Sequence, residues 1–234
     1  MRTESISVVV MTYDEVENLE AVVRELIEAL QGLPLEADVL IVDDGSRDGS
    51  GELADRLAAE LPAVRVVHHG DNRALGGVYR TGFAEARGDV VTFLPADGQF
   101  PADTIALFVE EIDDCHMVLG YLPDRKSSAV AKLLSAAERQ VYTLLLGPLP
   151  TFQGMMMFRR ELLDEVVLES QGRGWAIVWE LILKVDRGPY RVKSVPTKLR
   201  PRMSGHSKVN NLPTILANLK QVVGLRDLIP RKRQ

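Results

Sequence analysis

The chain has 234 residues, of which 46% are hydrophobic and 26% are charged, and its formal net charge at pH 7 is −5. This composition is that of an ordinary globular protein, long enough to bury a substantial core. Its only cysteine, Cys115, excludes an intramolecular disulfide and fits a reducing compartment. Residues 190–234 hold eleven Lys and Arg against one acid, and this basic end on an acidic body predicts an anionic partner.

Strands and amphipathic helices alternate over the first hundred residues. Apolar β-branched runs predict strands at 7–11, 39–42, 64–68 and 90–94, and helical periodicity predicts helices at 19–30, 53–61 and 76–87. Short loops join these segments. The alternation therefore predicts βαβ units and a parallel sheet.

After Pro101 the pattern loosens. Helices are predicted at 102–111, 127–146, 175–185 and 212–229, and strands at 115–119, 155–158 and 190–195. Residues 196–211 between them are polar, basic and contain proline. We interpret the second half as a region that shapes the substrate site, and not as a second independent domain.

Acidic residues follow three of the predicted strands directly. The strands run into Thr12-Tyr13-Asp14-Glu15, Asp43-Asp44 and Pro95-Ala96-Asp97. Because the carboxyl ends of parallel strands share one edge of the sheet, these acids should converge on one crevice. Gathered carboxylates repel one another, so they need a cation or hydrogen-bond donors to hold them. The pattern predicts a metal-assisted site for an anionic ligand.

The first strand is not followed by the glycine-rich turn of a dinucleotide-binding fold. Instead, Tyr13 could stack on a planar base, while Glu15 and Asp44 could accept hydrogen bonds from a base or a ribose hydroxyl. For each of these residues, capping of the next helix is an alternative role. The histidines show no spacing typical of metal ligands and are interpreted as structural or exposed: His68, His69 and His116.

Four sequence blocks together resemble the family 2 glycosyltransferases with a GT-A fold. They are residues 8–18, residues 42–50, Gly88-Asp89 and residues 96–101, and the resemblance spans about residues 5–210. It is closest to the polyprenyl-phosphate branch, which includes the dolichyl-phosphate mannose synthases. The fold it implies is α/β, with a GT-A-like mixed, mainly parallel sheet flanked by helices and a Rossmann-like nucleotide-binding half.

The resemblance also implies a division of the chain. Residues 1–211 would form the glycosyltransferase domain, with a nucleotide-sugar-binding half at 1–101 and an acceptor-side half at 102–211. The sequence pattern itself predicts an amphipathic helix and a basic tail at residues 212–234, which could contact a membrane surface; the alternative is a helix packed on its own domain with a frayed basic tail. No uncharged stretch is long enough to cross a bilayer and the first residues lack a signal peptide, so we expect a cytoplasmic protein, which the basic tail could hold peripherally at the inner face of the membrane.

The activity implied is the inverting transfer of a sugar from a GDP- or UDP-sugar to a polyprenyl or dolichyl phosphate, assisted by Mg²⁺ or Mn²⁺, with no nucleic-acid partner. Carried over by position, the nucleoside would be held by Met11, Tyr13, Glu15, Val42 and Asp44. The metal and diphosphate motif corresponds to Ala96, Asp97 and Gln99, with Asp97 and Gln99 at the metal. For Asp97, the alternative is a cap of the helix that follows Pro101.

The basic loop at 200–208 repeats the family's spacing of an arginine followed by Gly-x-Ser-Lys. The resemblance therefore implies that Arg202 and Lys208 contact the diphosphate and the incoming phosphate, as cationic side chains can. Arg125 is a weaker candidate for the same role, because Leu122 stands where the family has its arginine. Glu180 corresponds to an acid on a helix near the acceptor and is a candidate catalytic residue.

Two positions depart from the family pattern. Pro95 replaces the first acid of the Asp-x-Asp motif, and residues 150–157 lack the second acid expected before the Gly-Phe-Arg/Lys segment. A phosphate acceptor is already anionic near neutral pH and needs no general base, which makes the second loss compatible with transfer to a lipid phosphate. Two alternatives are transfer to a different acceptor and a nucleotide-sugar-binding protein with reduced catalysis.

Overall fold

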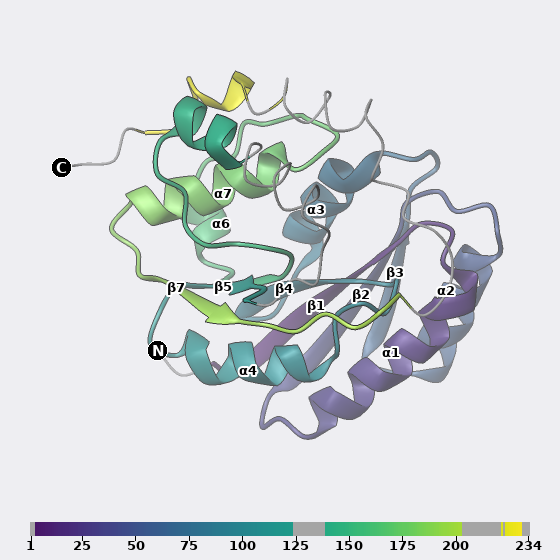
Figure 1. Cartoon of the computed structure of the whole chain (residues 1–234). Helices are drawn as coiled ribbons and strands as arrows, with labels where there is room; N and C mark the ends of the chain where they lie inside the picture. Colours follow the sequence, from purple (N-terminus) through teal and green to yellow (C-terminus); the bar gives the residue numbers. More distant parts are fainter. Residues whose placement is uncertain (1–2, 124–138, 203–220, 222, 231–234) are drawn as a thin grey trace.

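The computed structural model describes residues 3–123, 139–202, 221 and 223–230. Strands and helices alternate through most of this range (Figure 1). The strands are β1 (Ser5–Thr12), β2 (Glu36–Asp43), β3 (Val64–His68), β4 (Val90–Pro95), β5 (Met117–Tyr121), β6 (Met156–Arg159) and β7 (Val192–Pro196). The helices are α1 (Val16–Gln31), α2 (Ser50–Glu60), α3 (Ala74–Glu85), α4 (Asp103–Ile112), α6 (Leu162–Glu165) and α7 (Ala176–Arg187), and residues 139–146 are also helical.

All seven strands form one sheet in the order β3-β2-β1-β4-β6-β5-β7. Strands β3, β2, β1 and β4 are mutually parallel, β6 is antiparallel to both β4 and β5, and β7 is parallel to β5. The expected mixed, mainly parallel sheet is confirmed. From β1 the chain builds outward through β2 and β3 and then returns to place β4 on the other side of β1. The strand order therefore reverses between the neighbouring strands β1 and β4. Their carboxyl ends form the topological switch point, where ligands bind in open α/β sheets.

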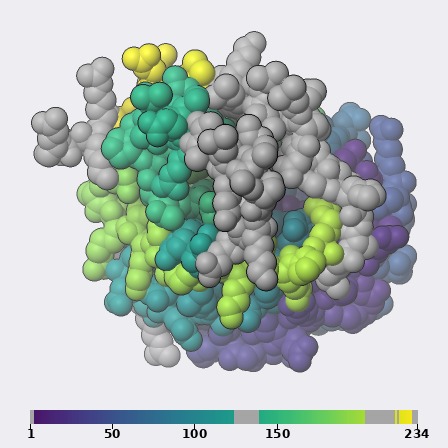
Figure 2. Space-filling model, in the orientation of Figure 1, coloured from purple at the N-terminus to yellow at the C-terminus, as the bar shows by residue number. Residues whose placement is uncertain are grey.

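Helices cover both faces of the sheet (Figure 1), with α1, α2 and α4 on one face and α3, α6 and α7 on the other. Alternate residues of each central strand supply the two cores, because successive side chains of a strand point to opposite faces. Val8 and Val10 pack in the core beneath α1 and α4, whereas Val9 packs beneath α3 and α7. Purple and blue residues of the first half lie at the right and lower right of the molecule, and green residues of the second half lie at the left and also near the centre (Figure 2).

The register of the strands brings their carboxyl ends level. Met11 of β1 lies opposite Val42 of β2 on one side and opposite Pro95 of β4 on the other. The backbone N–H of Asp44 donates to the Thr12 carbonyl, and that of Ala96 donates to the Met11 carbonyl. The residues that follow the three strands therefore begin at one edge of the sheet.

Several predicted elements differ from those observed. The strand expected at 115–119 begins only at Met117, because the N–H of Cys115 donates to the Ile112 carbonyl in the turn that ends α4. The helix expected at 76–87 begins at Ala74, and the short α6 was not predicted. Much of the helices expected at 127–146 and 212–229 lies outside the described residues. In the part of the chain that is described, no helix is long and apolar enough to span a bilayer.

The first residue of α3 has a strained backbone. Ala74 has φ +56°, a left-handed conformation that costs a residue with a Cβ about 1–2 kcal/mol. Glycine adopts it freely but loses more chain entropy on folding. The strain lies directly after Arg73, whose backbone N–H donates to Asp44, so the turn is held in place by the edge of the sheet.

We therefore expect Ala74→Gly to raise the free energy of unfolding, by up to about 1 kcal/mol. Urea denaturation followed by circular dichroism measures it. The matched control is Ala21→Gly at an exposed position within α1, which should lower the free energy of unfolding by about 1 kcal/mol. Equal losses in the two variants would mean that Ala74 is not strained.

Candidate functional site

The guanidinium group of Arg202 joins the two loops that flank the switch point. Its Nη1 donates to Glu15 Oε1 at 3.0 Å, and its Nη2 donates to Asp97 Oδ2 at 2.8 Å. Glu15 follows β1 and Asp97 follows β4. The side chains of all three residues are less than a fifth exposed, so this doubly paired cation lies well shielded from solvent. The prediction that Glu15 and Asp97 converge is confirmed, and their charges are balanced by an arginine that follows β7.

The loops after β1 and β2 are hydrogen-bonded to each other. The backbone N–H groups of Asp14 and Glu15 donate to the hydroxyls of Ser46 and Ser50, at 2.9 and 2.8 Å. In return, the N–H of Arg47 donates to Asp14 Oδ1. Glu15 Oε2 also accepts from Asn18, so both of its carboxylate oxygens are engaged. The Gly-Ser block of the sequence thus fixes where the acids after β1 lie.

The loop that carries Asp97 is held from both sides. Asp97 Oδ1 accepts from the N–H of Gln99, while Arg200 donates through its backbone N–H to the Gln99 carbonyl and through Nε to the Gly98 carbonyl. Helix α4 begins later, at Asp103, and its N-cap position is Ala102. Asp97 is therefore not a helix cap, and its Oδ2 faces Arg202.

Each of the two acids at the end of β2 is paired with a histidine. Asp43 Oδ2 lies 3.0 Å from His68 Nδ1, and Asp44 Oδ1 lies 2.6 Å from His69 Nδ1. Asp44 and His69 are both buried. The interpretation of His69 as structural or exposed is thus incomplete, because this ring contacts a candidate nucleoside-binding acid.

The candidate residues of the nucleotide-binding half lie at the same edge of the sheet. Met11 and Val42 are register partners near the ends of β1 and β2, and Ala96 begins the loop after β4. The segment where a second acid was expected lies close by: a Cβ built on Gly154, which has φ +103°, would come 2.4 Å from the Phe100 ring. Before that glycine stands Gln153, whose side-chain oxygen accepts from the N–H of Leu122.

Glu180 is fully buried on α7, and its carboxylate is hydrogen-bonded to neighbouring residues of the protein. Its two oxygens accept from the N–H groups of Glu169 and Ser170, and Oε1 lies 2.7 Å from Lys184 Nζ. These contacts order the loop before α7, and the catalytic role of Glu180 stays a prediction. Arg125 and Lys208 lie outside the described residues, so their roles also stay predictions.

The donor atoms at the switch point fit a hard divalent cation. Among the described residues, no three Asp, Glu, His or Cys side chains gather as a complete metal shell. Mg²⁺ and similar ions, however, are often held by one or two carboxylates together with phosphate oxygens of the substrate. Asp97 brings a carboxylate oxygen, and the position between Asp97 and Glu15 already stabilises the positive charge of Arg202.

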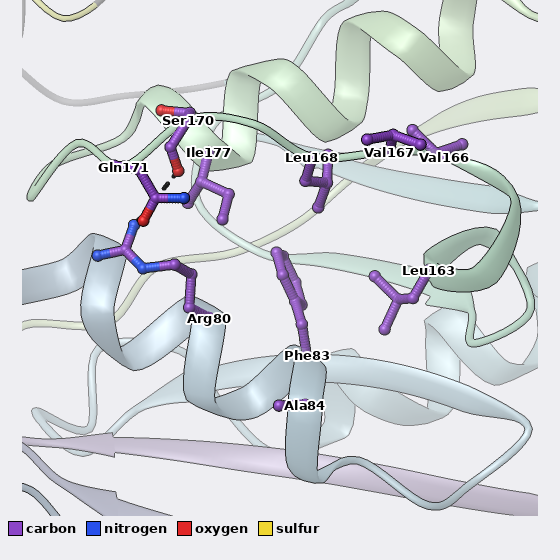
Figure 3. A pocket seen from close by; sticks show the side chains of 10 residues that line it. All are labelled: Arg80, Phe83, Ala84, Leu163, Val166, Val167, Leu168, Ser170, Gln171 and Ile177. Carbon is purple, nitrogen blue, oxygen red and sulfur yellow. Dashed lines mark hydrogen bonds between the residues drawn. The ribbon is translucent and has the colours of Figure 1, made fainter.

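A cavity of about 320 Å³ lies elsewhere, between α3, α6 and the loop before α7 (Figure 3). Arg80 lies at one end, where it donates to the Ser170 carbonyl, and Phe83, Ala84 and Leu163 lie toward the other. Ala84 is near the end of α3, about 16 Å along the helix from Arg73. Ala84 therefore lies far from Arg73, which contacts Asp44, whereas the Arg80 end of the cavity is nearer, because the next residue, Thr81, contacts His69.

Sequence reasoning missed Ser46, Ser50, His69 and Arg73 as parts of the site. The two serines belong to the 42–50 block and could have been found from it, because hydroxyls after a strand often hold neighbouring backbone N–H groups. His69 and Arg73 follow β3, after which a single acid, Asp71, stands, and they reach Asp44 only through the pairing of β3 with β2.

Comparison with known proteins identifies the family. Residues 7–167 match the model of the family described as "Glycosyl transferase family 2". The chain belongs to this family. It is therefore a glycosyltransferase, and the resemblance seen in the sequence is confirmed.

Two relatives of this glycosyltransferase are named as mannosyltransferases that use a polyprenyl phosphate. It is 30% identical to the undecaprenyl-phosphate mannosyltransferase of Micrococcus luteus over 213 residues, which is 86% of each chain. It is 31% identical over 231 residues to a dolichol-phosphate mannosyltransferase of Pyrococcus furiosus, covering 94% of this chain and 63% of the archaeal enzyme.

The GT-A fold is confirmed by a solved structure. Glucosyl-3-phosphoglycerate synthase from Mycobacterium tuberculosis, solved with Mn²⁺, UDP and glucosyl-3-phosphoglycerate, superposes with a TM-score of 0.67. The match covers 97% of this glycosyltransferase and 81% of that chain, at 22% sequence identity. At this identity the likeness shows the shared fold alone.

The contacts of His68 make the stability of the sheet edge depend on pH. Hydrogen bonds to Asp43 and then Asp55 raise the pKa of His68 above its ordinary value of about 6.5. A raised pKa in the folded state stabilises the fold fully below the unfolded pKa, and this stabilisation is lost as the pH rises through the folded pKa.

We expect the stability advantage of the wild-type protein over His68→Gln to be larger at about pH 6 than at about pH 8. Urea denaturation of both proteins at the two pH values measures the difference. In Asp55→Asn, which keeps the ring but removes one carboxylate partner, the pH dependence should be weaker than in the wild type. A wild-type advantage that does not change with pH would contradict the assignment.

Proposed function

We propose that this glycosyltransferase transfers a sugar, with inversion, from a GDP- or UDP-sugar to a polyprenyl phosphate, and that a divalent cation assists the transfer. The observation that carries the proposal is the Arg202 link between Glu15 and Asp97 across the switch point. It gathers two carboxylates and a guanidinium where a charged nucleotide ligand of an open α/β sheet binds. The named activities of the bacterial and archaeal relatives support the polyprenyl-phosphate acceptor.

In this proposal the nucleoside lies over the ends of β1 and β2. Tyr13 flanks the base, Glu15 and Asp44 accept hydrogen bonds from the base or the ribose, and Met11 and Val42 line the floor. Shielding from water strengthens such hydrogen bonds, and Asp44 is only 2% exposed. The diphosphate then extends over the loop of Ala96 and Asp97.

A divalent cation, Mg²⁺ or Mn²⁺, would be held by Asp97 with Gln99 and by oxygens of the diphosphate. When bound, it supplies positive charge that stabilises the departing diphosphate. The Mn²⁺ and UDP in the mycobacterial enzyme are consistent with this proposal. Arg202 and Lys208 add positive charge to the diphosphate as its bond to the sugar breaks.

The acceptor supplies the nucleophile. An oxygen of the lipid phosphate attacks the anomeric carbon from the face opposite the diphosphate, and the bond from that carbon to the diphosphate oxygen breaks with its electron pair. Configuration therefore inverts. Because the attacking phosphate is already ionised, no residue has to remove a proton. The absence of a second acid from residues 150–157 is compatible with this acceptor, whereas a sugar hydroxyl would need a general base.

The acceptor also suggests where the enzyme works. A polyprenyl phosphate presents its phosphate at a membrane surface, so we propose peripheral contact with the cytoplasmic face through residues 212–234. The proposal rests on the sequence pattern of an amphipathic helix followed by a basic tail, a combination that favours adsorption to anionic lipid. We further propose that residues 1–101 and 102–211 serve the nucleotide and the acceptor, respectively.

The donor site is tested by Asp97→Asn. Mn²⁺ should tighten the binding of GDP or UDP to the wild-type protein, and the substitution should reduce this tightening by about tenfold or more, because one charged ligand is lost. Isothermal titration calorimetry with and without Mn²⁺ measures it. Asp103→Asn, which removes the same charge from an exposed position on α4, should leave the Mn²⁺ effect intact. Nucleotide binding that is indifferent to Mn²⁺ in the wild type would refute the metal-assisted site.

The transfer itself is tested with Mn²⁺ and a panel of nucleotide sugars, with and without polyprenyl phosphate. We expect a lipid-linked sugar from the wild type, and a loss of about 100-fold in kcat for Arg202→Ala with less than about threefold change in donor affinity, because the guanidinium acts mainly on the departing charge. The control is Arg24→Ala, a surface arginine paired with Glu20 and Glu60.

The outcome of the panel separates the alternatives. Product on another acceptor alone would favour a different acceptor class. Donor binding without any product would favour a nucleotide-sugar-binding protein with reduced catalysis, as Pro95 and the missing second acid allow. Full turnover of Arg202→Ala at saturating donor would leave Arg202 as a neutralising partner of the acids only.

A further inference from the structure

His69 is a buried histidine directly after β3 and has partners on both ring nitrogens. Its Nδ1 lies 2.6 Å from Asp44 Oδ1, and its Nε2 lies 2.8 Å from the hydroxyl of Thr81 on α3. The side chains of His69 and Asp44 are 2% and 3% exposed. A buried polar chain that runs from a helix to a strand-end acid is costly unless every member is satisfied.

The chemistry of the partners fixes how the protons lie. An ionised carboxylate has no proton to donate, so His69 Nδ1 carries the proton of the bond to Asp44. Nε2 and the Thr81 hydroxyl share the second hydrogen bond, which is 2.8 Å long. A histidine whose far nitrogen is held in this way is fixed in both tautomer and ring orientation.

The same oxygen of Asp44 has a second donor. The backbone N–H of Arg73 donates to Oδ1 at 2.8 Å, so Oδ1 accepts two hydrogen bonds and the plane of the carboxylate is set. Among the described residues, no hydrogen bond to Asp44 Oδ2 is found. Within the described part of the chain, Oδ1 is thus engaged twice, and Oδ2 is the oxygen that a ligand could approach.

We infer that His69, held by Thr81, is a positioning residue that fixes the Asp44 carboxylate so that Oδ2 can accept a hydrogen bond from the nucleoside of the donor. The inference rests on the proposed function and goes further, since it names the groups that set the geometry of the nucleoside contact. His69 acts through Asp44 and does not itself touch the ligand. Its effect should therefore fall on donor affinity and not on the chemical step.

The test compares variants that remove the His69 contacts one at a time. His69→Asn keeps an N–H donor near the position of Nδ1 but cannot reach Thr81, Thr81→Val removes the far hydrogen bond at constant shape, and His69→Leu removes both. Isothermal titration calorimetry with GDP and UDP in Mn²⁺ gives the dissociation constants, at a temperature where circular dichroism shows each variant folded.

We expect His69→Leu to weaken nucleotide binding about tenfold, and His69→Asn and Thr81→Val to weaken it about threefold, since each loses part of a buried hydrogen-bond chain. Steady-state kinetics should show a higher KM for the donor with kcat changed by less than about twofold, as loss of ground-state binding predicts. A purely structural role would lower the melting temperature without this graded loss of affinity.

A double-mutant cycle shows whether His69 acts through Asp44. If it does, adding His69→Leu to Asp44→Asn should cost little affinity beyond Asp44→Asn alone. Equal nucleotide affinity in the wild type and all three His69 and Thr81 variants, or fully additive losses in the cycle, would overturn the inference while leaving the proposed function standing. A wild-type protein that binds neither GDP nor UDP would instead refute the donor site itself, and the inference with it.

Discussion

Mutual repulsion of carboxylates is the constraint on which this site depends. The parallel strands and their register bring Glu15, Asp43, Asp44 and Asp97 to one edge of the sheet, where ionised side chains without partners would destabilise the fold. Each acid has a polar partner, and two of the acids share one. Arg202 pairs with Glu15 and Asp97, His68 with Asp43, and His69 with Asp44. The acidic side chains at this edge are thus held in fixed positions by their partners. A binding site for a charged nucleotide requires polar groups in fixed positions.

The compensating groups come from distant parts of the chain. Arg202 is 187 residues from Glu15 in sequence, and it reaches the switch point because the chain passes the Asp97 loop after β7, where Arg200 is bonded to Gly98 and Gln99. The nucleotide-binding half and the segment after β7 are therefore linked electrostatically. In the proposed mechanism Arg202 would exchange its carboxylate partners for oxygens of the diphosphate, which carry charge of the same sign.

The departures from the family pattern make physical sense for one class of acceptor. Pro95 is the last residue of β4. The loop that follows it keeps one acid of the motif, Asp97. Residues 150–157 contain no acid, and the side-chain oxygen of Gln153 in this segment accepts from the N–H of Leu122. An acceptor that arrives already ionised needs charge neutralisation and position more than it needs a base, and cationic groups can supply both.

The sequence alone determined the alternation of strands and helices, the mainly parallel sheet and the gathering of acids, because hydrophobic periodicity and turn chemistry are local properties. It also placed Glu15, Asp44 and Asp97 at one edge, since parallel strands end on the same side. Only the tertiary structure decided which group is hydrogen-bonded to which acid. The pairing of β3 with β2 brings His69 to Asp44, and the return of the chain after β7 brings Arg202 to Glu15 and Asp97. Contacts between residues far apart in sequence follow from packing, which no local pattern encodes.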